Sequence, residues 1–215
     1  MDKAKAEVLR YLGHKGHEVQ ENIDRLLEEC MGQIREAATP RHVRLALPVS
    51  FRKEGVFLEN AALLLPGKDI ARLLDGCTQA VLMAATLGTA ADSLILRSQS
   101  TDLTRSLVLD ACATQLIEQY CDEIEQQICG EAQQSGLTAT PRFSPGYGDL
   151  PLGLQPALLS ILDAGRKIGL TCTESLIMLP RKSVTALIGL GPHLQKGPGG
   201  CTRCAQSDTC NFRKG

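Results

Sequence analysis

The sequence predicts an α+β fold, and three features lead to that prediction. Residues 18–38 and 102–134 repeat apolar side chains with the period of an α-helix. Two apolar runs bounded by turn residues, at 79–88 and 183–191, are typical of buried strands. Helical and strand patterns follow one another without a regular βαβ rhythm, which favours an α+β architecture over a doubly wound sheet.

The first third of the chain combines two helices with a strand region. Residues 3–12 form the first predicted helix, and Gly13 and Gly16 separate it from the second, at 18–38. The second helix is predicted from apolar residues at helical spacing, namely Val19, Ile23, Leu26, Leu27, Cys30 and Ile34. Residues 41–60 have strand character because Val43, Leu45 and Leu47 alternate with other residues and R-K-E-G offers a turn.

The middle of the chain contains the longest helical pattern. A short helix is predicted over 68–77, followed by the strand at 79–88 and a helix through residue 98 that Thr89 caps. The helix at 102–134 has one apolar stripe, formed by Leu103, Leu107, Ala111, Ala113, Leu116, Ile117, Tyr120, Ile124 and Ile128. Its acids Asp110, Glu118, Asp122 and Glu125 lie mostly off this stripe and are interpreted as a solvated face rather than a metal site. A further helix is predicted over 154–169 before the strand at 183–191.

Composition excludes several classes of function. The formal net charge is −1, the aromatic fraction is 3% and Trp is absent, which argues against nucleic-acid binding through a basic surface or stacked bases. No apolar run is long enough to span a membrane. The first residues have no apolar signal-peptide core, so we expect a cytoplasmic protein. The six cysteines that lie in apolar or helical contexts are then expected to be reduced: Cys30, Cys77, Cys112, Cys121, Cys129 and Cys172.

The common catalytic and nucleotide-binding motifs are missing. G-L-G-P-H-L at 189–194 begins like a dinucleotide fingerprint, but Leu194 replaces the third glycine and Pro192 falls where a helix should start. The sequence has no G-x-x-x-x-G-K-[ST] phosphate loop and no G-x-S-x-G nucleophile motif. No nucleophile with a matching base can be named, which argues against a hydrolase.

Residues 142–152, R-F-S-P-G-Y-G-D-L-P-L, interrupt the regular structure. Pro145 and Pro151 lack an N–H, and the two glycines lower helix propensity, so this segment is neither a helix interior nor a central strand. Taken alone, the segment is either a connector with a surface arginine or a ligand-binding loop.

The order R-x-x-P-G-Y in this segment resembles a motif of the activation domain of cobalamin-dependent methionine synthase. The domain carries R-x-x-P-G-Y-P-x-x-P, and residues 170–192 are similar to its later L-T-E-S-x-x-M-x-P-x-x-S-V segment and the strand that follows. The likeness covers most of residues 5–192. It implies a central antiparallel β-sheet with flanking helices over residues 1–195. The resemblance says nothing about residues 196–215, whose composition predicts a flexible Gly/Pro linker and a cysteine-rich tail.

The resemblance also implies a ligand and a role. The ligand would be S-adenosylmethionine, bound by Arg142, Pro145, Gly146 and Tyr147. An arginine can donate hydrogen bonds to the methionine carboxylate, and the backbone N–H and C=O groups of an open Pro-Gly segment can bond to the adenine or the amino-acid end. A tyrosine ring attracts a sulfonium through a cation–π contact. A free-standing copy would deliver the methyl donor in trans to the Co(II) corrinoid of a cobalamin-dependent methionine synthase. An electron donor would be the other partner, and cobalamin would be present only through the synthase.

The sequence departs from this family pattern at two places in these segments, and the N-terminal acidic contact of the large enzymes has no clear counterpart in it. Gly148 stands where the family has proline after the tyrosine, and Ile188 and Gly189 stand where an aromatic pair helps to hold the ligand. These departures leave open a second interpretation, in which the chain is an interaction module that has kept the fold and lost the ligand.

The last residues contain Cys201, Cys204 and Cys210 in the spacing C-x2-C-x5-C. C-x2-C is a common metal-ligand spacing, and both zinc and an iron–sulfur cluster suit thiolates. A fourth ligand would come from Cys172, His193, Asp208 or a partner. The alternatives are a tail with free thiols, or an iron–sulfur redox protein that donates electrons to a corrinoid partner.

Overall fold

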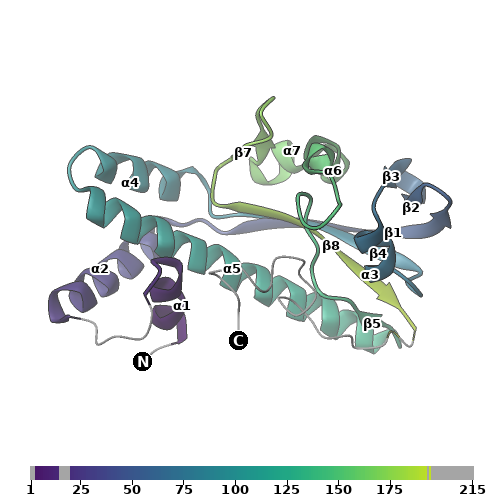
Figure 1. The fold of residues 1–215 in the computed structure, drawn as a ribbon, viewed down its shortest axis with the longest axis horizontal. Coiled ribbons are helices and arrows are strands. Elements are labelled where there is room, and N and C mark those ends of the chain that lie inside the picture. Colours follow the sequence, from purple (N-terminus) through teal and green to yellow (C-terminus); the bar gives the residue numbers. More distant parts are fainter. Residues whose placement is uncertain (1–2, 15–19, 193, 195–215) are drawn as a thin grey trace.

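The computed structural model describes residues 3–14, 20–192 and 194, and it shows an α+β fold (Figure 1). One sheet has six strands in the order β3-β2-β1-β4-β8-β5, and β6 and β7 form a separate two-stranded sheet. The strands are β1 (Arg41–Arg52), β2 (Gly55–Leu58), β3 (Leu63–Leu65), β4 (Gln79–Thr86), β5 (Thr138–Ala139), β6 (Thr171–Cys172), β7 (Met178–Leu179) and β8 (Ser183–Gly191). The α-helices are α1 (Lys3–Tyr11), α2 (Glu21–Ala37), α3 (Lys68–Leu73), α4 (Thr89–Gln99), α5 (Leu103–Gln134), α6 (Gln155–Leu162) and α7 (Ala164–Ile168). Two short 3-10 helices, η1 (Glu59–Ala61) and η2 (Leu152–Leu154), complete the described elements.

All neighbouring strands in the six-stranded sheet are antiparallel, which confirms the predicted architecture. β4 is central: Leu82 pairs with Leu45 of β1 on one side and with Leu187 of β8 on the other. β1 is long enough to change partner, because its residues 41–48 pair with β4 and its residues 49–52 pair with β2.

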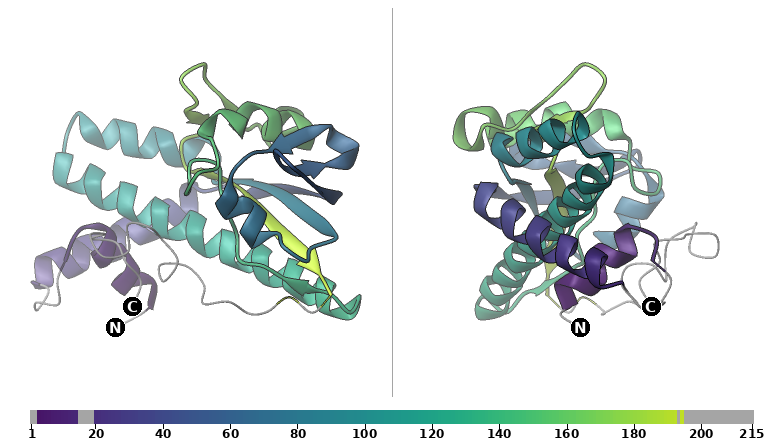
Figure 2. Two further views of the ribbon diagram at one scale, coloured as in Figure 1. Left: turned by 45° about the vertical axis from the view of Figure 1, so that its right-hand side comes forward. Right: turned by 90° about the vertical axis from the view of Figure 1, so that its left-hand side faces the viewer.

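Helices cover both faces of this sheet (Figure 2). On one face α1, α2, α4 and α5 pack together, with Leu27, Leu109 and Ile124 in a core that also receives Val81 and Ile188 from the strands. On the other face α3, α6 and α7 enclose a second core around Leu82, Leu74 and Leu187. β4 is buried along nearly its whole length because both cores meet on it. A strand buried on both faces must be apolar throughout, which explains its continuous apolar run.

Three local predictions were wrong. Leu103 and Leu107 are exposed on the first turns of α5, where Val108, Leu109 and Cys112 are buried instead. Thr89 is the first residue of α4 rather than its cap; the N-cap is Gly88, and a Cβ there would overlap the Thr39 hydroxyl. The helix predicted over 154–169 is divided into α6 and α7 by Asp163, whose φ of 54° is left-handed.

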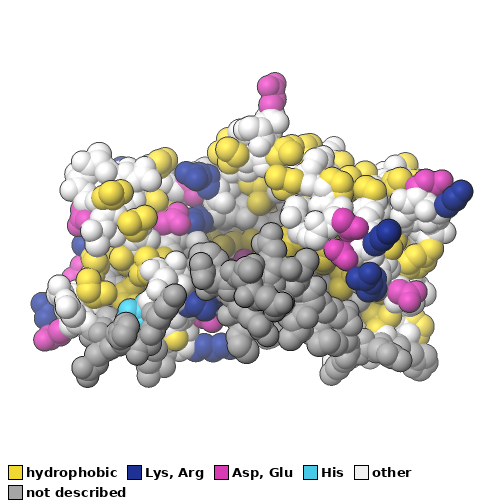
Figure 3. Space-filling model, viewed as in Figure 1, with side chains coloured by type: hydrophobic (Ala, Val, Ile, Leu, Met, Phe, Trp, Pro, Cys, Tyr) yellow, Lys and Arg dark blue, Asp and Glu magenta, His cyan; other side chains and the backbone are white. Residues whose placement is uncertain are grey.

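Side chains of both charge signs are interspersed with apolar ones on the face drawn in Figure 3. In the part of the chain that the structure describes, no helix combines the length and the apolar character needed to cross a membrane. Cys30, Cys77, Cys112, Cys121 and Cys172 are free thiols. Burial raises the pKa of Cys77 to about 11 and of Cys121 to about 12, so these two thiols are inert at neutral pH.

The packing of α3 on β8 depends on Gly189. A Cβ at this position would lie 2.5 Å from Cys77 Sγ and 2.6 Å from Leu74 Cδ2, and neither neighbour can move into solvent because both are buried. The strand can therefore approach the segment after α3 only because residue 189 has no side chain.

We predict that Gly189→Ala lowers the free energy of unfolding by about 1–3 kcal/mol, the usual cost of overpacking a core. Gly130→Ala is the control, because nothing lies within 4 Å of its added Cβ in α5. That variant should gain about 0.5–1 kcal/mol through helix propensity. Chemical denaturation measures both, and an unchanged stability of Gly189→Ala would contradict the close packing.

His42 of β1 makes a partly buried contact with Tyr120 of α5. Its Nδ1 lies 2.7 Å from the Tyr120 hydroxyl. Burial, together with the positive charge of Arg44, holds the pKa of His42 below its ordinary value. The folded protein thus binds a proton at His42 less readily than the unfolded chain, so stability falls as the pH drops through the ordinary histidine range.

We therefore expect the free energy of unfolding to be lower at pH 5.5 than at pH 7.5, and His42→Gln to reduce this difference. Glutamine stays neutral and can still bond to the Tyr120 hydroxyl. Denaturation of both proteins at the two pH values checks this. An equal pH dependence in wild type and variant would show that His42 does not cause it.

Candidate functional site

The segment 142–152 runs along the edge of the sheet and then turns back on itself. Phe143 exchanges two backbone hydrogen bonds with Leu187 of β8, of 2.9 and 2.8 Å, and so continues the edge begun by β5. A compact turn follows, in which the Tyr147 N–H donates to the Ser144 carbonyl and the Gly146 N–H donates to the Leu150 carbonyl at 2.8 Å. The segment is thus an ordered loop, which we call the 142–152 loop.

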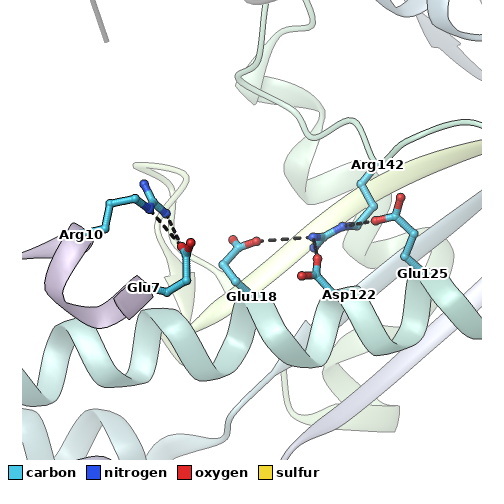
Figure 4. Close-up of polar contacts among 6 residues, drawn as sticks. All are labelled: Glu7, Arg10, Glu118, Asp122, Glu125 and Arg142. Atoms are coloured by element: carbon cyan, nitrogen blue, oxygen red, sulfur yellow. Dashed lines mark hydrogen bonds and ion pairs between the residues drawn. The ribbon is translucent and has the colours of Figure 1, made fainter. Parts of the chain in front are cut away.

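Arg142 points from this loop onto α5 and meets three carboxylates there (Figure 4). Its Nε–H donates to Glu125 at 2.7 Å, and its Nη2 contacts Asp122 and lies 3.5 Å from Glu118. The arginine side chain is only 16% exposed. Burial opposes its charge, but the neighbouring Cys121 and the three acids outweigh burial and raise the pKa of Arg142 above its ordinary value.

The three acids are partly solvated, as predicted, with side-chain exposures of 38% for Glu118, 51% for Asp122 and 25% for Glu125, but they also surround a cation that the prediction did not include. Residues 118, 122 and 125 are spaced i, i+4 and i+7, so they share one side of the helix. That side faces Arg142, and Glu118 and Glu125 are half-buried. The spacing was a usable signal in the sequence, but nothing identified the cation that the acids surround. Asp110, the fourth acid, pairs with Lys182 at 2.9 Å.

Three carboxylates around one guanidinium leave two negative charges in this cluster. Glu7 of α1 adds a further acid on the helix that packs against α5, and it is paired with Arg10 at 2.8 Å. The pKa of Tyr11, also on α1, is raised by burial first and then by Glu118. The field of the cluster therefore reaches α1, and the whole arrangement attracts a cationic group.

The other predicted ligand residues lie further along the 142–152 loop. Pro145 is buried. Gly146 has a φ of 90°, which only glycine adopts without strain. Tyr147 is 66% exposed, so its ring and hydroxyl are open to a ligand. The loop therefore carries one arginine held against α5 and one tyrosine presented to solvent.

The residues of the second motif, between 170 and 185, mainly make internal contacts. Thr173 closes the β6–β7 turn by accepting from the Ile177 N–H at 3.1 Å. The Ser183 hydroxyl donates to the Pro180 carbonyl at 2.7 Å and lies 2.8 Å from the Thr86 hydroxyl. This motif fixes the approach to β8 and brings no further charged side chain to the Arg142 cluster.

Ile188 and Gly189, which replace the aromatic pair, both face packed interiors. Ile188 is fully buried among the helices on the α5 side, and Gly189 lies against Leu74 and Cys77. An aromatic side chain at 189 would have to displace the segment that follows α3. The space that the aromatic pair would need is therefore filled by the protein itself.

The predicted metal ligands Cys201, Cys204 and Cys210 lie outside the described residues, as does His193. Cys172, another candidate, is half-buried in β6. Among the described residues, no group of three or more His, Cys, Asp or Glu side chains is arranged to hold a metal ion.

Comparison with known proteins agrees with this architecture. No protein-family model matches the sequence, and a search of curated proteins found no match. Among solved structures, the chain is similar to one described as "Crystal Structure of the MetH Reactivation Domain bound to AdoHcy". The TM-score is 0.65 with 17% sequence identity, over 85% of this chain and 69% of that chain. The chain therefore has the fold of the MetH reactivation domain, as the two sequence motifs predicted.

Proposed function

We propose that this chain binds S-adenosylmethionine at the 142–152 loop and supports, in trans, the reductive methylation of the Co(II) corrinoid of a cobalamin-dependent methionine synthase. The observation that carries this proposal is the Arg142 cluster on a loop that also presents Tyr147. The solved structure of the same fold, described as bound to AdoHcy, supports the ligand class.

The charges of the cluster suit the amino-acid end of this ligand. S-adenosylmethionine carries a carboxylate, an ammonium and a sulfonium, with a net charge of about +1 near neutral pH. Arg142 offers N–H donors to the carboxylate, while the acids attract the ammonium. Glu118 makes the longest of the three contacts with Arg142, at 3.5 Å, and is the acid most readily released to a ligand ammonium. The face of the exposed Tyr147 ring can contact the sulfonium through a cation–π interaction.

This chain needs no general acid or base for such a role, which agrees with the missing nucleophile–base pair. The corrinoid held by the partner, after one-electron reduction of Co(II) by an electron donor, would supply the methyl acceptor, and cleavage of the methyl–sulfur bond would leave S-adenosylhomocysteine. The contribution of this chain is to hold the ligand by its amino-acid end so that the methyl group faces the partner.

We expect S-adenosylmethionine to bind in isothermal titration, and Arg142→Ala to weaken binding by about 1.5–3 kcal/mol through loss of charge-assisted hydrogen bonds. Tyr147→Ala should cost about 0.5–1 kcal/mol and leave folding intact, because the ring is exposed. Glu118→Gln should also weaken binding.

The matched control is Arg44→Ala. Arg44 is another arginine that pairs with an acid of α5, Glu131, at 2.6 Å, and it belongs to β1 rather than to the 142–152 loop. It should leave ligand affinity unchanged. Failure of the folded wild-type protein to bind at millimolar ligand, alone and with the partner, would rule out this function and favour an interaction module.

The partner can be tested separately. The chain alone should not turn over S-adenosylmethionine, whereas mixing it with Co(II) methionine synthase and a reductant should restore methylcobalamin, followed by its visible spectrum. Methyl transfer to a small molecule at a comparable rate without any corrinoid protein would contradict the proposed role.

The cysteine tail stays a separate prediction. Cys201, Cys204 and Cys210 are close enough in sequence to share one metal ion. Anaerobic purification followed by iron and zinc analysis should find a metal that the triple Cys→Ser variant lacks. Iron with visible absorbance would favour a redox role in reactivation, and zinc would favour a structural metal site. Equal metal content in wild type and the triple variant would show that the three cysteines bind no metal.

A further inference from the structure

We infer that Asp149 is a positioning residue that holds Tyr147 in place by capping α3 from within the 142–152 loop. This inference rests on the proposed function, because its consequence is ligand affinity. It adds a residue that neither motif of the resemblance includes among the expected ligand contacts.

The contact between Asp149 and α3 is made by both carboxylate oxygens. The Lys68 N–H donates to Oδ2 at 2.6 Å and the Asp69 N–H donates to Oδ1 at 3.0 Å. The N-cap of α3 is Gly67, which has no side chain to accept these bonds. Asp149 thus provides the cap that the helix lacks locally, from a loop distant in sequence. These two N–H donors lower the pKa of Asp149, so the carboxylate stays charged throughout the neutral range.

Two glycines allow this approach. Gly67 has a φ of 124°, and a Cβ there would lie 2.6 Å from Asp149 Oδ1. Gly148 has a φ of 52°, and a Cβ there would overlap Asp69 Oδ2. Proline is fixed near a φ of about −65° and cannot adopt the Gly148 conformation. The loop therefore reaches α3 in a conformation that a proline at position 148 could not adopt.

The helix that receives Asp149 is itself fixed in the core. Ile70 and Leu74 are fully buried, and Leu74 lies against β8 at Gly189. Asp149 therefore ties the loop to the sheet through α3. Tyr147 is two residues away within the same turn, and the Leu150 N–H donates to its carbonyl at 3.1 Å. An anchored turn presents the tyrosine in one conformation, which reduces the ordering cost of binding.

Hydrogen exchange and ligand titration on Asp149→Ala and Asp149→Asn test the inference. In Asp149→Ala, we expect amide exchange in residues 144–150 to become about tenfold faster. S-adenosylmethionine affinity should fall by about five- to twentyfold. Asp149→Asn keeps one of the two accepting oxygens, so it should recover part of the exchange protection and of the affinity that Asp149→Ala loses.

Asp102→Ala is the matched control, because Asp102 caps α5 by accepting the Arg105 N–H at 2.9 Å and lies outside the loop. It should lower stability without changing loop exchange or affinity. Unchanged loop exchange in Asp149→Ala would overturn the inference, and so would faster exchange with unchanged affinity. If wild type binds no S-adenosylmethionine while loop exchange still depends on Asp149, the proposed function is wrong, and so is the effect of Asp149 on affinity. The anchoring of the loop by Asp149 would then still be supported.

Discussion

The pairing of Arg142 with α5 is the interaction on which the candidate site depends. A guanidinium that is mostly buried requires anionic partners, and α5 provides Glu118, Asp122 and Glu125 along one side. The pairing fixes the first residue of the 142–152 loop against the long helix. It also creates a concentration of negative charge beside a loop whose tyrosine is exposed. The loop is consequently held at its start by α5 and at its end by α3.

The two departures from the family pattern have one structural explanation. Gly148 allows the loop to touch the start of α3, and Gly189 allows β8 to pack against Leu74 just after α3. A proline at 148 could not adopt the φ of 52° found there, and an aromatic residue at 189 would have to displace Leu74 and Cys77. In this chain, Leu74 and Cys77, which follow α3, therefore fill the space that a larger side chain at 189 would need.

The strongest periodic patterns were sufficient to predict the main elements. Apolar runs predicted β4 and β8, and helical spacing predicted α2 and α5, because burial on one or both faces dictates those patterns directly. The predictions failed where a distant segment decides the outcome. Leu103 and Leu107 continue the apolar stripe of α5, yet no described element covers them, and the break at Asp163 depends on one left-handed residue. The strands β5, β6 and β7 are too short to produce a pattern.

The sequence identified only some of the residues that the structure brings together at the candidate site. The R-x-x-P-G-Y order identified the loop, and Tyr147 is exposed there. The acids around Arg142 and the cap provided by Asp149 were not predicted, since each joins segments that are far apart in the sequence. The spacing of Glu118, Asp122 and Glu125 showed a shared helix side but not what it faces.

The central claim is that S-adenosylmethionine contacts both Arg142 and Tyr147, and nuclear magnetic resonance of the complex tests it most directly. The account predicts intermolecular NOEs from the ligand's sulfonium methyl or adjacent protons to the Tyr147 ring. It also predicts a shift of the Arg142 Nε–H signal as the guanidinium exchanges part of its contact with α5 for the ligand carboxylate. Saturating ligand that leaves both signals unchanged, or NOEs confined to another surface, would contradict the account.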